Sequence, residues 1–418
     1  MSLLGPEVGK AMTVFLLATL DTKGSEAQLL RERLQSLGSQ VCLVDVGCLG
    51  EPTVLADISR EEVFAAAGTT HHELVVANDR GSAVTAAARG AAQIIKNAHH
   101  REAVKGVLAL GGSAGTTIGT AAMRVLPVGI PKLMVSTLAS GQVRPYVADK
   151  DILMLNSVVD LAGINRISRR VLTNAAAAMA GMVQQQPAFA TRDRPLLAAT
   201  MFGVTTPCVE RARAVLEEAG YEVLVFHATG NGGQAMESLI EEGLLLGVLD
   251  LTTTELADEL VGGILSAGPQ RLTAAARRGI PQVISVGATD MVNFGPPETI
   301  PAEFSERTFY HHNPTVTLMR TTVSESQRVG AEIARKVSAA SGPAVILLPL
   351  RGVSAIDAEE QPFEDLLARQ ALFDAIKEHA AGVPVLELDH HINDEAFAVA
   401  AAEHLLAMIQ SEQVDQTD

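Results

Sequence analysis

This chain of 418 residues is poor in aromatic side chains. Aromatic residues make up 3% of the sequence and tryptophan is absent, while 47% of the residues are hydrophobic. The cores must therefore be built from Val, Ile, Leu and Ala, a composition typical of parallel sheets covered by helices. The length exceeds what one core usually holds, which predicts two or three domains.

Cysteine is scarce as well, with only Cys42, Cys48 and Cys208. Their spacing matches no zinc motif, and an odd, small number of cysteines does not make a disulfide framework. We therefore expect a cytoplasmic protein whose cysteines are packing residues. No HExxH spacing is present, so no transition-metal site is predicted.

Basic residues show no clustering, and the formal net charge is −16. A nucleic-acid-binding surface needs a basic stripe, so nucleic acid is not expected as a partner. The chain begins without a signal-peptide pattern, and its apolar runs are too short to span a bilayer. A membrane partner is therefore not expected either.

The order of predicted elements occurs twice. Residues 12–21, 24–38 and 40–47 read as strand, helix and strand, and the same order returns at 194–202, 207–220 and 221–230. Further echoes are "GVLAL" with "GVLDL" and "GIPKLMVST" with "GIPQVISVG", and "GVPVLELD" shows the second pattern again.

This repetition predicts an α/β protein with two similar Rossmann-like domains. Each would hold a mainly parallel sheet flanked by helices, with a cleft between the domains. The polar, proline-containing segment 187–195 is the predicted linker between domains 1–186 and 196–418. The alternative is one large sheet with a surface loop at that segment.

The segment "GVLALGGSAGTT" (106–117) ends an apolar strand in glycine and hydroxyl residues. Loops after parallel strands can offer backbone N–H groups and a helix N-terminus to an anion, and glycine lets the anion approach closely. We interpret the segment as a phosphate-binding loop. It is not a Walker A loop, because no Lys follows, nor the strict dinucleotide fingerprint. A glycine turn of purely structural use is the alternative.

Two other predicted strand ends in the first half resemble this loop. In "ATLDTKGSE", Lys23 could supply the missing cation and Asp21 could orient a hydroxyl or a metal, although Thr22 or Ser25 could simply cap the helix. The segment "VSTLASGQ" (135–142) adds further hydroxyl groups. The predicted nucleotide-binding residues are Asp21, Thr22, Lys23, Gly24, Gly111, Gly112, Ser113, Gly115, Thr116, Thr117, Ser136, Thr137, Ser140 and Gly141.

Loops of the second half are richer in ionisable groups. We expect these groups to line the cleft, with four residues as the candidate catalytic set: His312, Arg320, His391 and Asp394. A nucleotide could bring Mg²⁺ with it, because that ion needs only a carboxylate and phosphates.

Seven blocks along the chain resemble the ATP-binding-domain family named after the tomato mosaic virus resistance protein. They are "ATLDTKGSEA", "LALGGSAGTT", "VSTLASG", "SVVDLAGINRISR", "GVLDLTTTELADELVGG", "HNPTVTLMRTT" and "HHINDEAF". The resemblance implies two Rossmann-like domains, ATP binding and self-association as a homodimer or larger homo-oligomer. It implies no reaction.

Three functions remain open at this level. The first is an ATP-binding protein whose N-terminal domain holds the phosphates. The second is an enzyme acting on a small phosphorylated or carboxylated metabolite in the cleft, with the catalytic set given above. The third is a nucleotide-responsive regulatory or protein-interaction module, which would form no product.

Overall fold

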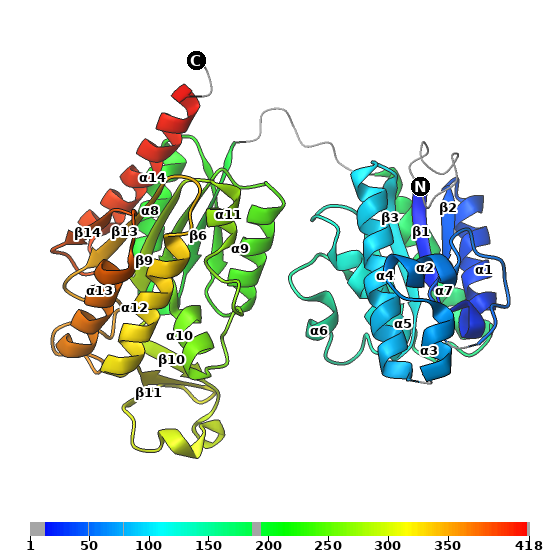
Figure 1. Cartoon of the computed structure of the whole chain (residues 1–418), viewed down its shortest axis with the longest axis horizontal. Coiled ribbons are helices and arrows are strands. Elements are labelled where there is room, and N and C mark those ends of the chain that lie inside the picture. Colours follow the sequence, from blue (N-terminus) through cyan, green and yellow to red (C-terminus); the bar gives the residue numbers. More distant parts are fainter. Residues whose placement is uncertain (1–12, 49, 78, 186–193, 416–418) are drawn as a thin grey trace. The chain divides into compact units, whose positions relative to one another are not determined.

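The computed structural model describes residues 13–48, 50–77, 79–185 and 194–415. The chain divides into two compact units, Met1–Phe189 and Ala190–Asp418, and each contains its own parallel sheet (Figure 1). Most of the predicted linker, 187–195, lies outside the described residues. The two α/β architectures confirm the predicted fold class.

The N-terminal sheet has five parallel strands in the order β2-β1-β3-β4-β5. This is the doubly wound order in which the chain runs from β1 outward to β2 and then crosses to the other side at β3. The strands are β1 (Thr13–Ala18), β2 (Val41–Asp45), β3 (Val104–Gly111), β4 (Lys132–Ser136) and β5 (Leu153–Asn156).

Helices cover both faces of this sheet because its central strands are apolar on both sides. Along β1, Phe15 and Leu17 pack under one helix layer, while Val14, Leu16 and Ala18 pack under the other. The first layer contains α2 (Arg60–Ala66), α4 (Arg80–His100) and α5 (Ser113–Arg124), and the second contains α1 (Leu20–Ser36) and α7 (Arg166–Gln184). Two shorter helices are α3 (His71–Ala77) and α6 (Arg144–Val147).

The C-terminal sheet repeats the same order with one strand added. Its six parallel strands run β7-β6-β8-β9-β13-β14, so β6, β7 and β8 occupy the places of β1, β2 and β3. The "GVLAL" and "GVLDL" echoes fall on β3 and β8, as the predicted repeat requires. The strands are β6 (Leu196–Met201), β7 (Glu222–His227), β8 (Gly247–Thr252), β9 (Gln282–Gly287), β13 (Ala344–Pro349) and β14 (Val385–Leu388).

Helices again lie on both faces of the C-terminal sheet. One face is covered by α8 (Thr206–Glu218) and α14 (Glu395–Asp415). The other face is covered by α9 (Asn231–Glu241), α10 (Thr254–Val261), α11 (Ala274–Arg278), α12 (Val323–Val337) and α13 (Leu366–His379).

A small antiparallel sheet, which the sequence did not predict, is inserted between β9 and α12 (Figure 1). It has the order β10-β12-β11, formed by β10 (Met291–Phe294), β11 (Phe309–Asn313) and β12 (Val316–Arg320). Short 3₁₀ turns occur at Gly203–Thr205, Pro297–Thr299 and Ala302–Phe304. The insertion carries two of the predicted catalytic residues, His312 and Arg320.

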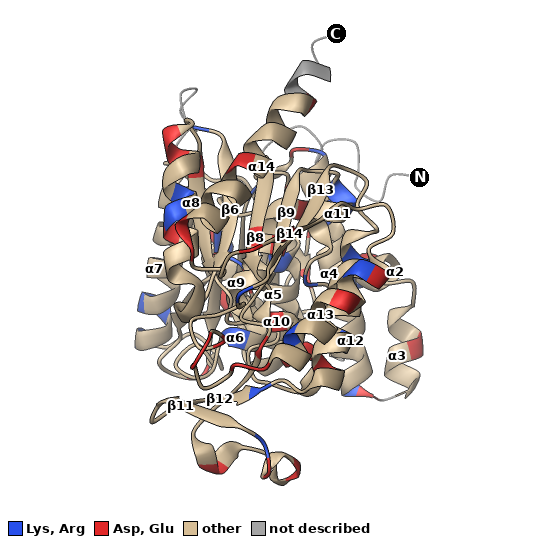
Figure 2. Cartoon of the chain, turned by 90° about the vertical axis from the view of Figure 1, so that its left-hand side faces the viewer, with Lys and Arg blue, Asp and Glu red and all other residues tan. Residues whose placement is uncertain are grey.

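Charged residues of both signs are interspersed over the helices, with no continuous basic face in view (Figure 2). No helix in the described ranges is long and apolar enough to cross a membrane. All three cysteines are buried and unpaired, as predicted.

Candidate functional site

A cavity of about 400 Å³ lies at the carboxyl end of the N-terminal sheet, beside the ends of β1 and β3. In a sheet of this order, the crevice between these two strands is the switch point where ligands usually bind. Two of the three predicted phosphate-binding segments contribute to its wall. The lining residues are Thr19, Asp21, Thr22, Lys23, Cys48, Gly50, Arg80, Val84, Gly112, Ser113, Ala114 and Gly115.

Lys23 lies where the turn after β1 joins the body of α1. The carbonyl oxygen of Thr19 accepts hydrogen bonds from the backbone N–H groups of Thr22 (3.0 Å) and Lys23 (2.8 Å). At Lys23 the backbone leaves helical geometry, with φ −129° and ψ 20°, so the helix is kinked there. The sequence placed the helix start at residue 24, after this kink, and missed the separate turn that carries Lys23.

Gly24 has a packing reason to be glycine. A Cβ atom at this position would lie 2.0 Å from Oγ1 of Thr53. That hydroxyl is fixed, because it donates a 3.0 Å hydrogen bond to the carbonyl oxygen of Leu20. The predicted ligand contact at Gly24 is therefore not needed to explain this residue, and Gly24 is not among the lining residues.

A buried ion pair between Asp45 and Arg60 holds backbone segments next to the cavity, although neither residue lines it. Arg60 Nε lies 2.7 Å from Asp45 Oδ2, and both side chains are 3% exposed. The other oxygen of Asp45 accepts hydrogen bonds from the backbone N–H groups of Leu20 (3.1 Å) and Gly47 (2.8 Å), and Arg60 donates to the carbonyl oxygen of Gly50. One carboxylate thus fixes the turn after β1 and the segment after β2.

Two cations in the cavity wall have no partner among the described residues. Lys23 and Arg80 make no side-chain hydrogen bond or ion pair with any residue that the structure describes. Asp21 is already engaged, since its Oδ2 accepts the N–H of Gly50 at 3.1 Å. Burial, followed by the negative charge of Asp21, raises the pKa of Cys48 to about 11, so this lining residue is a neutral thiol at pH 7.

The glycines after β3 have two different roles. A Cβ on Gly111 would lie 2.8 Å from the Cα of Gly115, and a Cβ on Gly115 would lie 2.9 Å from the carbonyl oxygen of Leu110. These two glycines allow the strand end and the first helical turn to pack closely. Gly112 differs, because the nearest atom to its Cβ position is Thr137 Oγ1 at 3.7 Å.

The N-terminus of α5 is presented to this cavity without a side-chain cap. The first N–H group bonded within the helix turn is that of Thr116, which donates to the carbonyl oxygen of Gly112 at 2.8 Å. The residue before the helix, Gly112, has no side chain to accept the preceding N–H groups. An α-helix leaves those groups unpaired, and together they attract anions. Ser113, Ala114 and Gly115 line the cavity at this end.

The hydroxyls of Thr116 and Ser136 do not reach the cavity. Both side chains are fully buried and share a 2.7 Å hydrogen bond. Thr116 also donates to the carbonyl oxygen of Gly112, while Ser136 accepts the N–H of Leu138. These two residues tie α5 to the end of β4.

The remaining predicted residues, three with hydroxyl groups and one glycine, lie outside the cavity lining. Thr117 donates its hydroxyl hydrogen to the carbonyl oxygen of Ser113 at 3.0 Å. Thr137 is half-buried at the end of β4, and Ser140 and Gly141 are exposed on the turn that follows. None of the four is among the residues that line the cavity.

In the C-terminal domain, the equivalent position is filled by its own side chains. Pairing Gly106 with Gly247 places the segment 111–115 opposite 252–256, which reads Thr-Thr-Thr-Glu-Leu. Thr252, Thr253 and Glu255 are fully buried. The carboxylate of Glu255 instead reaches the glycine loop before α9, where it accepts the N–H groups of Gly230 (2.7 Å) and Gly233 (3.1 Å).

A fully buried arginine, Arg271, neutralises this carboxylate. Its Nε lies 2.6 Å from Oε2 of Glu255, and its two terminal nitrogens bind Asp250. Glu237 lies at 3.4 Å. The glycine loop before α9 is therefore occupied by a carboxylate of the chain itself.

Arg320 of the predicted catalytic set is 7% exposed and used within the fold. Its Nε donates to the carbonyl oxygen of Phe363 (2.8 Å) and its Nη1 to Oγ1 of Thr321 (2.7 Å). Its Nη2 lies 3.5 Å from Asp357. These bonds attach the inserted sheet to the loop after β13.

His391 and Asp394 lie together at the start of α14. The N–H of Asn393 donates to Nδ1 of His391 (3.1 Å), so Nε2 carries the proton and donates it to the carbonyl oxygen of Ser354 (2.9 Å). Asp394 Oδ2 accepts the backbone N–H of His391 at 2.8 Å.

The loop 353–357 thus contacts both Arg320 and His391, whereas His312 is exposed on β11. The catalytic assignment of these residues stays a prediction.

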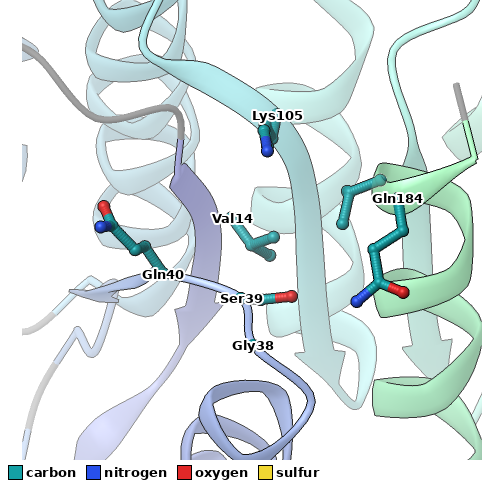
Figure 3. A pocket seen from close by; sticks show the side chains of 7 residues that line it. Val14, Gly38, Ser39, Gln40, Lys105 and Gln184 are labelled. Carbon is teal, nitrogen blue, oxygen red and sulfur yellow. The ribbon is translucent and has the colours of Figure 1, made fainter.

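A second cavity, of about 360 Å³, lies at the opposite end of the N-terminal sheet (Figure 3). Val14 and Lys105 from the starts of β1 and β3 line it, together with Gly38, Ser39 and Gln184. The helices α1 and α7 end here, and helix C-termini carry partial negative charge. This cavity is therefore less suited to an anion than the one at the carboxyl end. In the described ranges, no group of three or more His, Cys, Asp or Glu residues could hold a metal ion.

Sequence reasoning missed Arg80, Asp45 and Arg60. Asp45 follows a buried strand, and that position was an available signal for a residue near the site. Arg80 begins a helix about thirty residues before the glycine loop, and nothing in its local sequence links it to β1 or β3.

Family models match both halves of the chain. Residues 12–188 match the "Uncharacterised protein family (UPF0261) N-terminal domain" and residues 194–409 match the corresponding C-terminal domain. A UPF0261 protein of Clostridium tetani is 49% identical over 95% of this chain and 99% of its own length. A second one, from Rhizobium meliloti, is 48% identical over 93% of this chain and 97% of its own length.

A plant relative matches at lower identity. The ToMV resistance protein Tm-1 of Solanum lycopersicum is 40% identical over 94% of this chain, which corresponds to 55% of the tomato protein. The suspected resemblance is thereby confirmed. Among solved structures, the glycosyltransferase SnogD of Streptomyces nogalater aligns with 96% of this chain and 100% of its own, at 11% identity and a TM-score of 0.19. That score is too low to support an inference.

Proposed function

The chain belongs to the UPF0261 family, and we propose that its N-terminal domain binds a nucleotide, ATP, with the phosphates at the N-terminus of α5. The observation that carries the proposal is the uncapped start of α5 in a cavity of about 400 Å³, with Lys23 and Arg80 unpaired in its wall. Helix N-terminal N–H groups and nearby cations are the usual means of holding phosphate. The proposal assigns no reaction.

The charge of the cavity favours an anion in a protein that is otherwise acidic. Two cations and one carboxylate, Asp21, line the wall, whereas the whole chain carries a formal charge of −16. A local excess of positive charge in a concave site raises the concentration of anionic ligands there. Asp21 is also the carboxylate that would hold Mg²⁺ brought in by the phosphates.

The C-terminal domain supports the proposal by contrast. Its equivalent turn is buried, and its glycine loop is occupied by Glu255. An internal carboxylate bound to helix N–H groups is chemically similar to a bound phosphate oxygen. In the part of the N-terminal domain that the structure describes, no lining carboxylate caps the start of α5.

The contrast provides the test. Ala114 occupies the position of Glu255 in the repeat, so Ala114→Glu should place a carboxylate at the N-terminus of α5 and compete with phosphate. We expect isothermal calorimetry to show ATP binding by the original chain and a roughly tenfold or greater loss of affinity in Ala114→Glu. The introduced carboxylate is negative like the phosphate, so it repels the phosphate and competes for the same N–H groups. The matched control is Gln35→Glu, which adds the same charge at the exposed end of α1.

Thermal unfolding separates a binding effect from a folding effect. Acidic residues in the first turn of a helix stabilise it, so Ala114→Glu should unfold no earlier than the original chain. Unchanged ATP affinity in Ala114→Glu, or no ATP binding by the original chain at millimolar concentration, would contradict the proposal.

A further inference from the structure

The second cation of the cavity, Arg80, comes from a different helix layer than Lys23. Lys23 belongs to α1, which covers one face of the N-terminal sheet, and Arg80 is the first residue of α4, which covers the other face. The cavity lies at the carboxyl end of the strands, between these two helix layers. Its two unpaired positive charges therefore approach a ligand from two sides.

Arg80 faces the cavity together with Val84, one helical turn later, and both line the wall. The helix that carries them is well fixed. A Cβ on Gly90 of α4 would lie 1.9 Å from the carbonyl oxygen of Val63, so α4 packs directly on the backbone of α2. Arg80 is thus an exposed side chain on a helix that is packed against its neighbour.

The acidic residue beside Arg80 does not neutralise it. Asp79 caps α4, with Oδ1 accepting the N–H of Gly81 at 2.9 Å and Oδ2 accepting the hydroxyl of Ser82 at 2.5 Å. These hydrogen bonds lower the pKa of Asp79, the one to Ser82 contributing most. The carboxylate is therefore committed to the helix cap, and the guanidinium of Arg80 remains available for a ligand.

We propose that Arg80 makes this cavity selective for ligands with two or more linked phosphate groups over ligands with one. The inference rests on the proposed function and goes further by naming the specificity-determining residue. The first phosphate group binds at the N-terminus of α5, with Lys23 beside it. A second phosphate then meets Arg80, whose planar guanidinium can donate two parallel hydrogen bonds to phosphate oxygens.

The test measures how the affinity of the full chain depends on the number of phosphate groups in a simple ligand. Calorimetry would measure inorganic phosphate, pyrophosphate, AMP, ADP and ATP against the original chain, Arg80→Ala and Lys96→Ala. Lys96 lies exposed on the same helix α4, outside the cavity lining, so its variant controls for the loss of one positive charge.

We expect Arg80→Ala to weaken the affinity for pyrophosphate, ADP and ATP roughly tenfold or more. The affinity for phosphate and AMP should change less than about threefold. Lys96→Ala should change none of them beyond about twofold. Because Arg80 makes no side-chain hydrogen bond or ion pair with a described residue, its variant should unfold at the same temperature as the original chain.

Two results would overturn the inference while leaving the proposed function intact. One is an equal loss for mono- and diphosphate ligands in Arg80→Ala. The other is equal affinity of the original chain for phosphate and pyrophosphate. If the original chain binds none of the five probes, the proposed function fails and this inference fails with it.

Discussion

The Nε atom of Arg271 lies 2.6 Å from Oε2 of Glu255, and both side chains are fully buried in the C-terminal domain. A buried ion pair of this kind becomes costly when one partner is removed, because the remaining charge has no water around it. Arg271→Ala should therefore lower the free energy of unfolding by about 3–5 kcal/mol, measured by urea denaturation. The control is Arg277→Ala, which breaks a half-exposed pair with Glu241 and should cost no more than about 1 kcal/mol. Similar losses in both variants would contradict the structural role of Arg271.

The contact between Gly24 and Thr53 gives a prediction about packing. Gly24→Ala places a methyl group 2.0 Å from Oγ1 of Thr53 and should destabilise the chain by about 1–3 kcal/mol. In the double variant Gly24→Ala, Thr53→Ala, the clashing oxygen is gone and the nearest remaining Thr53 atom, Cβ, is 3.3 Å away. We expect thermal unfolding to show the double variant as more stable than Gly24→Ala alone. The opposite order would show that Thr53 is not the cause.

Thr116 and Ser136 were predicted to contact the nucleotide, but the structure gives them a buried hydrogen bond to each other. Thr116→Val keeps the shape and removes that bond. It should lower the free energy of unfolding by about 1–2 kcal/mol and leave ATP affinity within about twofold of the original. A large loss of ATP affinity without a loss of stability would contradict this role and support the predicted contact between Thr116 and the nucleotide.

Asp258 provides a prediction about pH. Burial raises its pKa from 3.8 to about 7, although hydrogen bonds from Asn293 oppose the shift. The folded state therefore keeps a proton that the unfolded chain releases between about pH 4 and pH 7, and stability falls as pH rises through this window. Asp258→Asn removes the titrating group, so its thermal midpoint should fall less than that of the original chain between pH 5 and pH 8. Identical pH profiles for the two proteins would contradict the assignment.

The main strands and the two-domain repeat could be predicted from the sequence because buried parallel strands are short apolar runs with recognisable ends. The pair "GVLAL" and "GVLDL" indicated two related domains, and both segments are the β3-type strand of their sheets. Lys23 and the glycine loop were placed near each other for the same reason, since each directly follows a strand of one sheet. The inserted sheet β10-β12-β11 was missed because its strands are short and are separated by segments that contain prolines and polar residues.

Side-chain direction could not be predicted from residue type. Thr116 and Ser136 have the same chemistry as Ser113, yet their hydroxyls are buried and Ser113 lies in the cavity wall. Arg271 and Arg80 are both isolated arginines in the sequence, but one is fully buried among carboxylates and the other is exposed at the cavity. Only the packing of distant helices distinguishes these cases.

The central claim is that phosphate binds at the start of α5, and a crystal structure of the full chain with ATP and Mg²⁺ tests it most directly. The account predicts phosphate oxygens within hydrogen-bonding distance of the backbone N–H groups of Ser113, Ala114 and Gly115, with Lys23 beside them. Phosphate density at another place in the chain, with water alone at the start of α5, would contradict it.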